Sequence, residues 1–223
     1  YLEYARRFPE KNIDRNMQSL IQRARIYEDQ GNSRMLDKIH EEMLELYHAL
    51  RAENRAGELS QDSVAAIAGL AFPTLLAMLD EYAEIKFENT FDQEALAPVK
   101  EAKEAKAREI SAAADEFELT YPDFDHIMAC YYIRADLFRE YADMIYAWDP
   151  PPPPGWPRDE DSLIEFEELI EEIKLELGEP QELQAIKLFE LVLEAARRWK
   201  RNSPWVEKAR EALHDVDPNT YPL

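Results

Sequence analysis

The sequence predicts an all-α protein, either a helical bundle or an irregular stack of helical hairpins. Ala, Leu and Glu are abundant among the 223 residues whereas Val and Thr are scarce, and this composition favours helices over strands. Apolar residues recur at spacings of three and four, and no stretch alternates apolar with polar residues for the length of a strand. Together with the positions of Gly and Pro, these spacings predict about eight helices.

The first five predicted helices form a helical body over residues 1–148. Gly31 is suited to end the first helix in the left-handed conformation, Ser33 to cap the second helix, and Gly57 to end it. The short turn between these two helices predicts an antiparallel hairpin. The third helix is apolar on most sides and is expected at the centre of the body, with Pro73 either kinking or restarting it. The five helices are predicted at residues 14–30, 34–56, 60–79, 98–118 and 123–148.

A proline-rich linker is predicted at residues 149–158. Consecutive prolines fill positions 150–154 and are followed by Gly155, Trp156 and Pro157, so the segment is expected to be extended, in the polyproline II form. It separates the body from a C-terminal segment, residues 159–223. That segment is short for an independent domain and is expected to pack back on the body.

Three helices are predicted in the C-terminal segment. Ser162 and Glu165 can form a capping box that opens the first of them, and Gly178 can close it. Pro180 is suited to the first position of the second helix, and Ser203 is suited to cap the last. These helices are predicted at residues 162–177, 180–201 and 204–214.

The net charge of −21 indicates what the protein binds and what it does not. A chain with 47 acidic and 26 basic residues is repelled by nucleic-acid phosphates and by anionic membranes, so a basic protein surface is the expected partner. The excess lies in the middle of the chain. Residues 59–148 carry 18 acidic and 7 basic side chains, residues 149–180 carry 11 and 2, and both ends are nearly neutral.

Cysteine content and hydrophobic run length bear on the location of the protein. Cys130 is the single cysteine, which excludes an intramolecular disulfide and a Cys-rich zinc site and fits a reducing compartment. The longest uncharged apolar run, residues 63–79, is short for a membrane span and contains Gly69 and Pro73. A cytoplasmic protein without a membrane span is therefore predicted, and its oligomeric state is left open.

The helix after the proline run is the predicted partner-binding surface. Its apolar residues, Leu163, Phe166, Ile170, Ile173 and Leu177, form a narrow seam at spacings of three and four, with glutamates on the other faces. The seam could dock a basic partner while the carboxylates orient it; alternatively, the seam packs on the protein's own body and the glutamates are only solvated. The predicted binding residues are Glu165, Glu167, Glu168, Glu171, Glu172 and Glu176.

The function predicted from this surface is an acidic protein–protein interaction module: an inhibitor, an immunity factor, an adaptor or an assembly factor. Carboxylates on rigid helices can also imitate the spacing of phosphates, so DNA mimicry is a special case of the same prediction. No two of the five glycines lie closer than 12 residues, which excludes a P-loop and a dinucleotide-binding glycine turn. The sequence favours a binding protein over an enzyme and predicts no cofactor.

A helical metal-dependent enzyme is the alternative function. Each of the four histidines follows a carboxylate by three residues, the spacing used in di-iron carboxylate bundles, and His40, Asp123 and His126 are the candidate metal ligands. A second version is a magnesium-dependent nucleotide pyrophosphohydrolase. The pairs Glu42/Glu45 and Glu81/Glu84 weakly resemble its acidic motifs, although the second pair has Glu where that family has Asp.

A possible ligand pocket is predicted on the fifth helix, where aromatic residues at helical spacing surround one guanidinium. Arg134 could hold a carboxylate or phosphate of a ligand, or contact an aromatic residue of a partner. The alternative is a core stripe in which Arg134 pairs with an acid of the same protein. The pocket residues are predicted to be Tyr131, Arg134, Phe138 and Tyr141.

Overall fold

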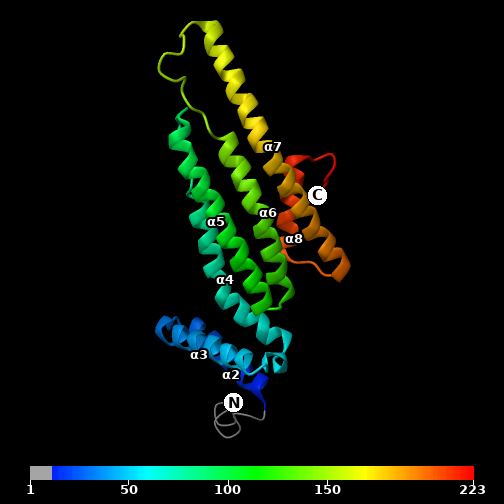
Figure 1. Cartoon of the computed structure of the whole chain (residues 1–223). Coiled ribbons are helices and arrows are strands. Elements are labelled where there is room, and N and C mark those ends of the chain that lie inside the picture. Colours follow the sequence, from blue (N-terminus) through cyan, green and yellow to red (C-terminus); the bar gives the residue numbers. More distant parts are fainter. Residues whose placement is uncertain (1–11) are drawn as a thin grey trace. The chain divides into compact units, whose positions relative to one another are not determined.

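The computed structural model describes residues 12–223 and confirms the all-α class. Within this part of the chain there are seven α-helices, one short 3-10 helix and no strand (Figure 1). The α-helices are α2 (Ile13–Asp29), α3 (Ser33–Ala52), α4 (Gln61–Ala83), α5 (Gln93–Thr120), α6 (Phe124–Tyr146), α7 (Glu160–Trp199) and α8 (Pro204–Val216), and the 3-10 helix is η1 (Ala56–Glu58).

The described chain packs as two compact units. Unit 1 contains residues 12–74 and Glu118–His126, and unit 2 contains Leu75–Phe117 and Ile127–Leu223. Helices α4, α5 and α6 each contribute residues to both units. These units are defined by packing, whereas the sequence predicts a boundary at the proline-rich segment, residues 149–158. Both sides of that segment belong to unit 2, and its role as a linker stays a prediction.

Unit 1 is built around the predicted hairpin of α2 and α3, whose buried residues include Met17, Leu20, Ile39 and Met43. Gly31 has a φ of +64°, which fits the left-handed turn expected there.

The predicted ends of α3 were wrong. Its cap is Asn32, whose Oδ1 accepts a hydrogen bond from the Met35 N–H at 3.2 Å, and not Ser33. It ends at Ala52, before Asn54 with a φ of 56°, so Asn54 rather than Gly57 provides the left-handed residue.

Helix α4 is more exposed than predicted. Pro73 lies inside one continuous helix, and only 33% of the most apolar 18-residue stretch is buried, so α4 is not the enclosed central element expected. By length and composition it is long and apolar enough to cross a membrane, a criterion that core helices of soluble proteins also meet. Its buried residues include Val64, Ile67 and Leu75.

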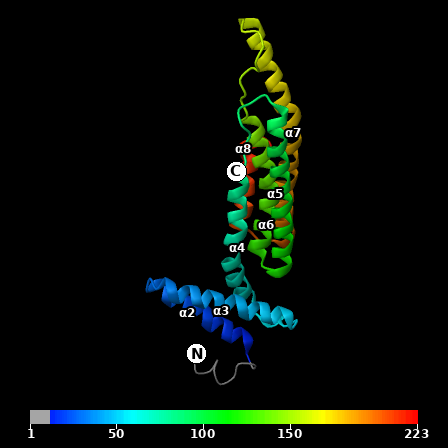
Figure 2. The ribbon, with the colours of Figure 1, turned by 60° about the vertical axis from the view of Figure 1, so that its left-hand side comes forward.

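Unit 2 is an assembly of α5, α6, α7 and α8 with the last part of α4. Figures 1 and 2 show α5 and α6 side by side, with the second half of α7 along α6. Tyr132 connects α6 to both α7 and α8, because its ring lies 5.3 Å from that of Phe189 in α7 and 5.5 Å from that of Trp205 in α8. Ser203 caps α8 as predicted, accepting from the Val206 N–H.

The prediction of two separate helices at 162–177 and 180–201 was wrong, because α7 continues from Glu160 to Trp199. Gly178 is buried against α6 and does not end a helix: a Cβ placed on it would lie 2.6 Å from Cε1 of Tyr146. Any larger residue at this position would have to displace the Tyr146 ring of α6. Pro180 is tolerated inside the helix. The N-cap is Asp159, which accepts from the Ser162 N–H at 3.0 Å, so the predicted capping box does not form.

Two buried charges in unit 2 serve the fold. Lys103 is 1% exposed, and its Nζ donates to the carbonyls of Tyr82 at 2.7 Å and Ile85 at 3.2 Å, where α4 ends. Burial lowers the pKa of Lys103 to about 8. Burial also raises the pKa of Asp136, which is opposed by the adjacent Arg139 guanidinium at 2.6 Å. Both groups have internal partners, as buried charges require.

Candidate functional site

The apolar seam of the first half of α7 packs on the protein itself. Phe166 is 3% exposed and Ile170 is 4% exposed, and both belong to a buried cluster with Trp148. Ile173 packs partly against this cluster, whereas Leu177, at the end of the seam, is 46% exposed. The seam is therefore mostly occupied by the protein's own residues, as in the alternative interpretation of the sequence.

The six predicted binding glutamates stand in the solvent. Glu171 forms an ion pair with Lys174 at 2.9 Å. The other five make no ion pair or hydrogen bond with side chains in the part of the chain that the structure describes, so their charge is not neutralised internally. All six are exposed: Glu165, Glu167, Glu168, Glu171, Glu172 and Glu176.

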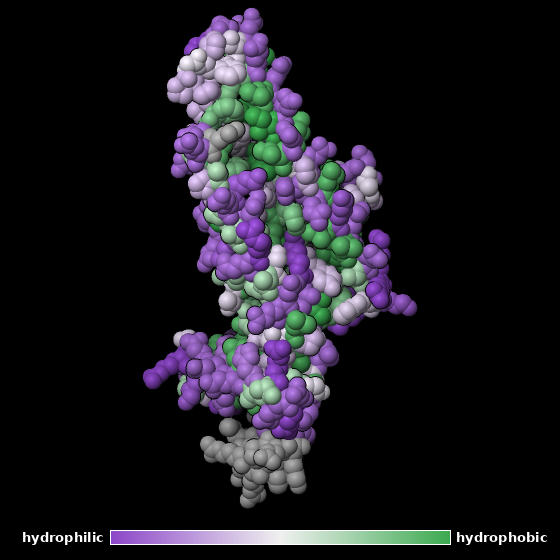
Figure 3. Space-filling model, viewed as in Figure 1, coloured by the Kyte–Doolittle hydropathy of each residue, from purple (hydrophilic) through white to green (hydrophobic). Residues whose placement is uncertain are grey.

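A hollow of about 770 Å³ lies between the proline run and the first half of α7. Three carboxylates border it, those of Asp149, Glu167 and Glu171, and no Lys or Arg is among the residues that line it. We call this feature the acidic hollow; it is lined by Asn89, Asp149, residues 150–152, Leu163, Phe166, Glu167, Ile170 and Glu171. In Figure 3, apolar atoms gather beside the upper part of α7 with hydrophilic atoms on both sides.

The floor of the acidic hollow is held by aromatic packing. The ring of Phe166 lies 5.6 Å from that of Phe91 and 5.3 Å from that of Trp156. Phe91 stacks on Trp148, whose Nε1 donates to the Thr90 carbonyl at 3.3 Å. These contacts fix the floor, because aromatic side chains held on several sides have little freedom.

The proline run forms one wall of the hollow and is not extended throughout. The Trp156 N–H donates to the Pro153 carbonyl at 3.1 Å, which closes a turn, and Gly155 within it has a φ of +92°. The Trp156 Nε1 also donates to the Ser162 carbonyl at 2.8 Å. These hydrogen bonds tie the segment to the start of α7, which a freely extended linker would not allow.

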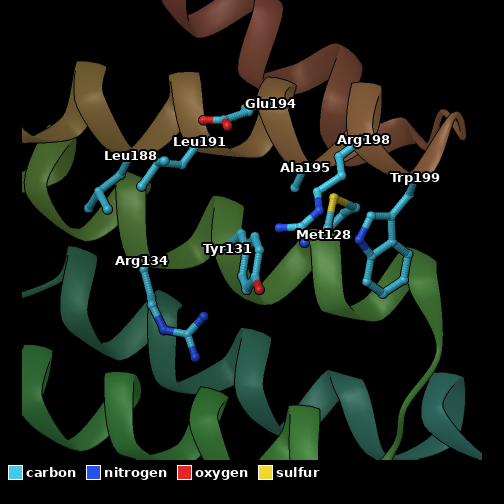
Figure 4. A pocket seen from close by; sticks show the side chains of 9 residues that line it. All are labelled: Met128, Tyr131, Arg134, Leu188, Leu191, Glu194, Ala195, Arg198 and Trp199. Carbon is cyan, nitrogen blue, oxygen red and sulfur yellow. The ribbon is translucent and has the colours of Figure 1, made fainter.

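The predicted pocket residues of α6 are only partly among those that line a cavity of the structure. Tyr131 and Arg134 line a cavity of about 420 Å³ between α6 and α7, whereas Phe138 and Tyr141 are half-buried and do not line it. Arg134 forms an ion pair with Asp115 at 2.5 Å. In Figure 4 its guanidinium points away from α7, as expected if it pairs with an acid of the same protein.

The α7 side of this cavity was missed from the sequence. We call the feature the apolar groove; it is lined by Met128, Tyr131, Arg134, Leu188, Leu191, Glu194, Ala195, Arg198 and Trp199. A signal was present in the run Arg197-Arg198-Trp199-Lys200-Arg201, which places four cations and an aromatic residue at one helix end of an acidic protein. Arg198 and Trp199 of this run line the groove.

The candidate metal ligands are not gathered into a site. Asp123 is the cap of α6: its Oδ2 accepts from the His126 N–H at 3.2 Å and lies 2.7 Å from His126 Nδ1. The His126 ring also packs edge-on against Phe72. Across residues 12–223 no three His, Cys, Asp or Glu side chains, His40 included, are grouped so that they could hold a metal ion.

The acidic pairs of the pyrophosphohydrolase alternative have other contacts. Glu42 lies 3.8 Å from Arg23, and Glu81 pairs with Lys106 at 2.6 Å. One glutamate of each acidic pair is thus engaged by a basic side chain of the same protein. Cys130 is fully buried, as expected for a packed thiol.

The fold and these sites define an all-helical acidic protein that carries the acidic hollow and the apolar groove in unit 2. Comparison adds no family to this description, since no protein-family model, no curated protein and no solved structure matches the chain.

Proposed function

We propose that the protein is an acidic interaction module that binds a basic protein surface at the acidic hollow. The observation that carries the proposal is the composition of the hollow. Three carboxylates, those of Asp149, Glu167 and Glu171, border an apolar floor made by Phe166 and Ile170. This is the arrangement that recognises a cationic group on an apolar stem, such as a Lys or Arg side chain of a partner.

The charge around the hollow supports the same proposal. Residues 149–180 carry 11 acidic and 2 basic side chains, and one of the two bases, Lys174, already pairs with Glu171. Carboxylates concentrated on one rigid helix attract cationic surfaces and speed their association. An inhibitor, an immunity factor, an adaptor or an assembly factor would use such a surface. DNA mimicry is the case in which the basic surface is a nucleic-acid-binding groove.

The test compares two double charge reversals on the same helix. E167K/E171K removes two carboxylates from the hollow, whereas E168K/E172K makes the same change in net charge at exposed positions that do not line it. The probe is a lysine-rich peptide with interleaved leucines, and its affinity is measured by calorimetry at physiological salt. Far-UV circular dichroism checks that both variants keep the helicity of the wild type.

The proposal predicts that E167K/E171K weakens peptide binding about tenfold or more relative to E168K/E172K. A direct contact between a lysine of the peptide and a carboxylate of the hollow contributes more binding energy than the long-range attraction of the whole protein's charge. Equal losses in the two variants would mean that the field of the whole protein, and not the hollow, attracts the peptide. Peptide binding that is unchanged in E167K/E171K would contradict the proposal.

A further inference from the structure

The apolar groove lies in unit 2, apart from the residues of the acidic hollow, and its chemistry is of the opposite kind. Its volume of about 420 Å³ falls within the range of roughly 300–1,000 Å³ that is usual for small-molecule sites. Its walls are apolar or aromatic over most of their length, with Met128 and Tyr131 from α6 and Leu188 and Leu191 from α7. A second area of apolar atoms in Figure 3 lies beside the second half of α7.

One cation of the groove has no partner among the described residues. Arg198 is exposed and makes no hydrogen bond or ion pair there, whereas Arg134 is engaged by Asp115. In Figure 4 the Arg198 guanidinium points toward Tyr131, while the Glu194 carboxylate runs along α7 and does not point toward that ring. The groove therefore presents a guanidinium that is available to an incoming anion.

The surroundings of Arg198 are also positive. Arg197, Lys200 and Arg201 are exposed and lie within three residues of it, so four cations are close together in sequence where α7 ends. This concentration opposes the negative partial charge of the helix C-terminus, which would otherwise disfavour an anion. Four of the five residues at positions 197–201 are thus cationic in a protein whose net charge is −21.

The groove offers apolar contact along its length as well as a charge. Leu188 and Arg198 are ten residues apart on α7, which at a rise of 1.5 Å per residue corresponds to about 15 Å. Ala195, which lies between them and lines the groove, has a small side chain that leaves room. Leu191 is 52% exposed and Trp199 is 48% exposed, so both keep apolar surface that a ligand could cover.

We propose that the apolar groove binds an amphiphilic carboxylate, with its anionic head on the Arg198 guanidinium and its alkyl or aromatic body along Ala195, Leu191 and Leu188. The head gains charge-assisted hydrogen bonds from a planar fork of donors that suits a carboxylate. The body removes the exposed leucine surface from water.

The experiment uses the full chain and decanoate as the probe, below the concentration at which it forms micelles. Binding is measured by calorimetry and by the fluorescence change of the tryptophans. Decanol and decylamine are titrated in parallel, because they carry the same chain with a neutral or a cationic head. We expect decanoate to bind at least about tenfold more tightly than either, since a hydrogen bond to a charged group adds that much.

Two neighbouring cations provide the matched pair of variants. R198A removes the guanidinium that lines the groove, and R197A removes an exposed guanidinium that does not line it. We expect R198A to weaken decanoate binding about tenfold to hundredfold and R197A to weaken it less than threefold. A third variant, A195F, fills the groove and is expected to reduce the binding of every alkyl probe. W199F should remove most of the fluorescence change but not the calorimetric signal.

The proposal is overturned if decanoate does not bind, if decylamine binds as tightly, or if R197A and R198A behave alike. It is also overturned if an acidic leucine-rich helical peptide binds in a manner that depends on Arg198 while decanoate does not, because the groove would then be a protein-docking surface. Circular dichroism spectra and thermal midpoints like those of the wild type are required of each variant.

Discussion

The two halves of α7 pack in the same way but present opposite surfaces. Phe166 in the first half and Phe189 in the second are both almost fully buried. Outside this stripe, the first half displays glutamates beside the acidic hollow, whereas four cations lie at and just beyond the end of the second half, one of them, Arg198, lining the apolar groove. One helix thus shows that burial is set by the apolar stripe and is independent of the charge on the exposed faces. The charge pattern is then free to serve binding.

The largest expected effect tests whether the two halves are anchored equally. Phe166→Ala and Phe189→Ala should each lower the free energy of unfolding by about 3–5 kcal/mol, because each removes a buried aromatic ring and leaves a cavity. Urea denaturation of the full chain, followed by circular dichroism, measures both. A cost below about 1 kcal/mol for Phe166→Ala alone would show that the first half of α7 is not held by its seam.

The next largest effect on the free energy of unfolding is expected at Gly178, which lies where the two halves of α7 meet. Gly178→Ala should cost about 1–3 kcal/mol, because the added methyl group must displace the Tyr146 ring, which its Cβ would approach to 2.6 Å. The matched control is Gly69→Ala in α4, also inside a helix, where the nearest atom to the new Cβ is 4.0 Å away. That change should stabilise the protein by about 0.5–1 kcal/mol. A neutral or stabilising result at Gly178 would contradict this prediction, because the Tyr146 ring would then move aside without a cost in stability.

A smaller effect is expected from the buried charge of Lys103, compared with that of Lys106, which pairs with an exposed acid. The pKa of Lys103 is about 8 in the folded protein and near its ordinary value when unfolded. Between these pKa values the unfolded chain binds more protons, so the contribution of Lys103 makes the free energy of unfolding rise with pH above about 8. That contribution is on the order of 1 kcal/mol per pH unit.

The measurement is the free energy of unfolding at pH values from about 7.5 to about 9.5. This range begins near the folded-state pKa of Lys103 and ends below its unfolded-state pKa. The difference in unfolding free energy between the wild type and Lys103→Met should grow with pH in this window. The control is Lys106→Met, because Lys106 pairs with the exposed Glu81 and its pKa is raised, chiefly by that hydrogen bond. Parallel behaviour of the two variants would contradict the assignment of a depressed pKa to Lys103.

Periodicity predicted the helices and the buried stripe of α7 because both depend on local spacing. It failed at Gly178 and Pro180, since the reason for that glycine is the Tyr146 ring of another helix, which no local pattern contains. The same limit explains the incomplete pocket prediction. Tyr131 and Arg134 were found on α6, whereas the other wall of the groove, with Leu188 and Leu191, comes from a helix distant in sequence.

The acidic surface was more predictable than the hollow it borders. Charge density is read directly from sequence, and the six glutamates are exposed as solvated helix positions should be. The hollow depends on a turn at residues 153–156 that folds the proline run back toward α7, and prolines alone do not specify where such a turn closes.

The association rate of the lysine-rich peptide, measured by stopped-flow at several salt concentrations, shows whether the acidic surface of α7 recruits a cationic partner. If the exposed carboxylates on the first half of α7 recruit a cationic partner, the rate constant should fall about tenfold or more between low and physiological salt, where screening acts beyond roughly 8 Å. In E167K/E171K both the rate and its salt dependence should decrease. A wild-type rate constant that stays the same across this range would contradict the account.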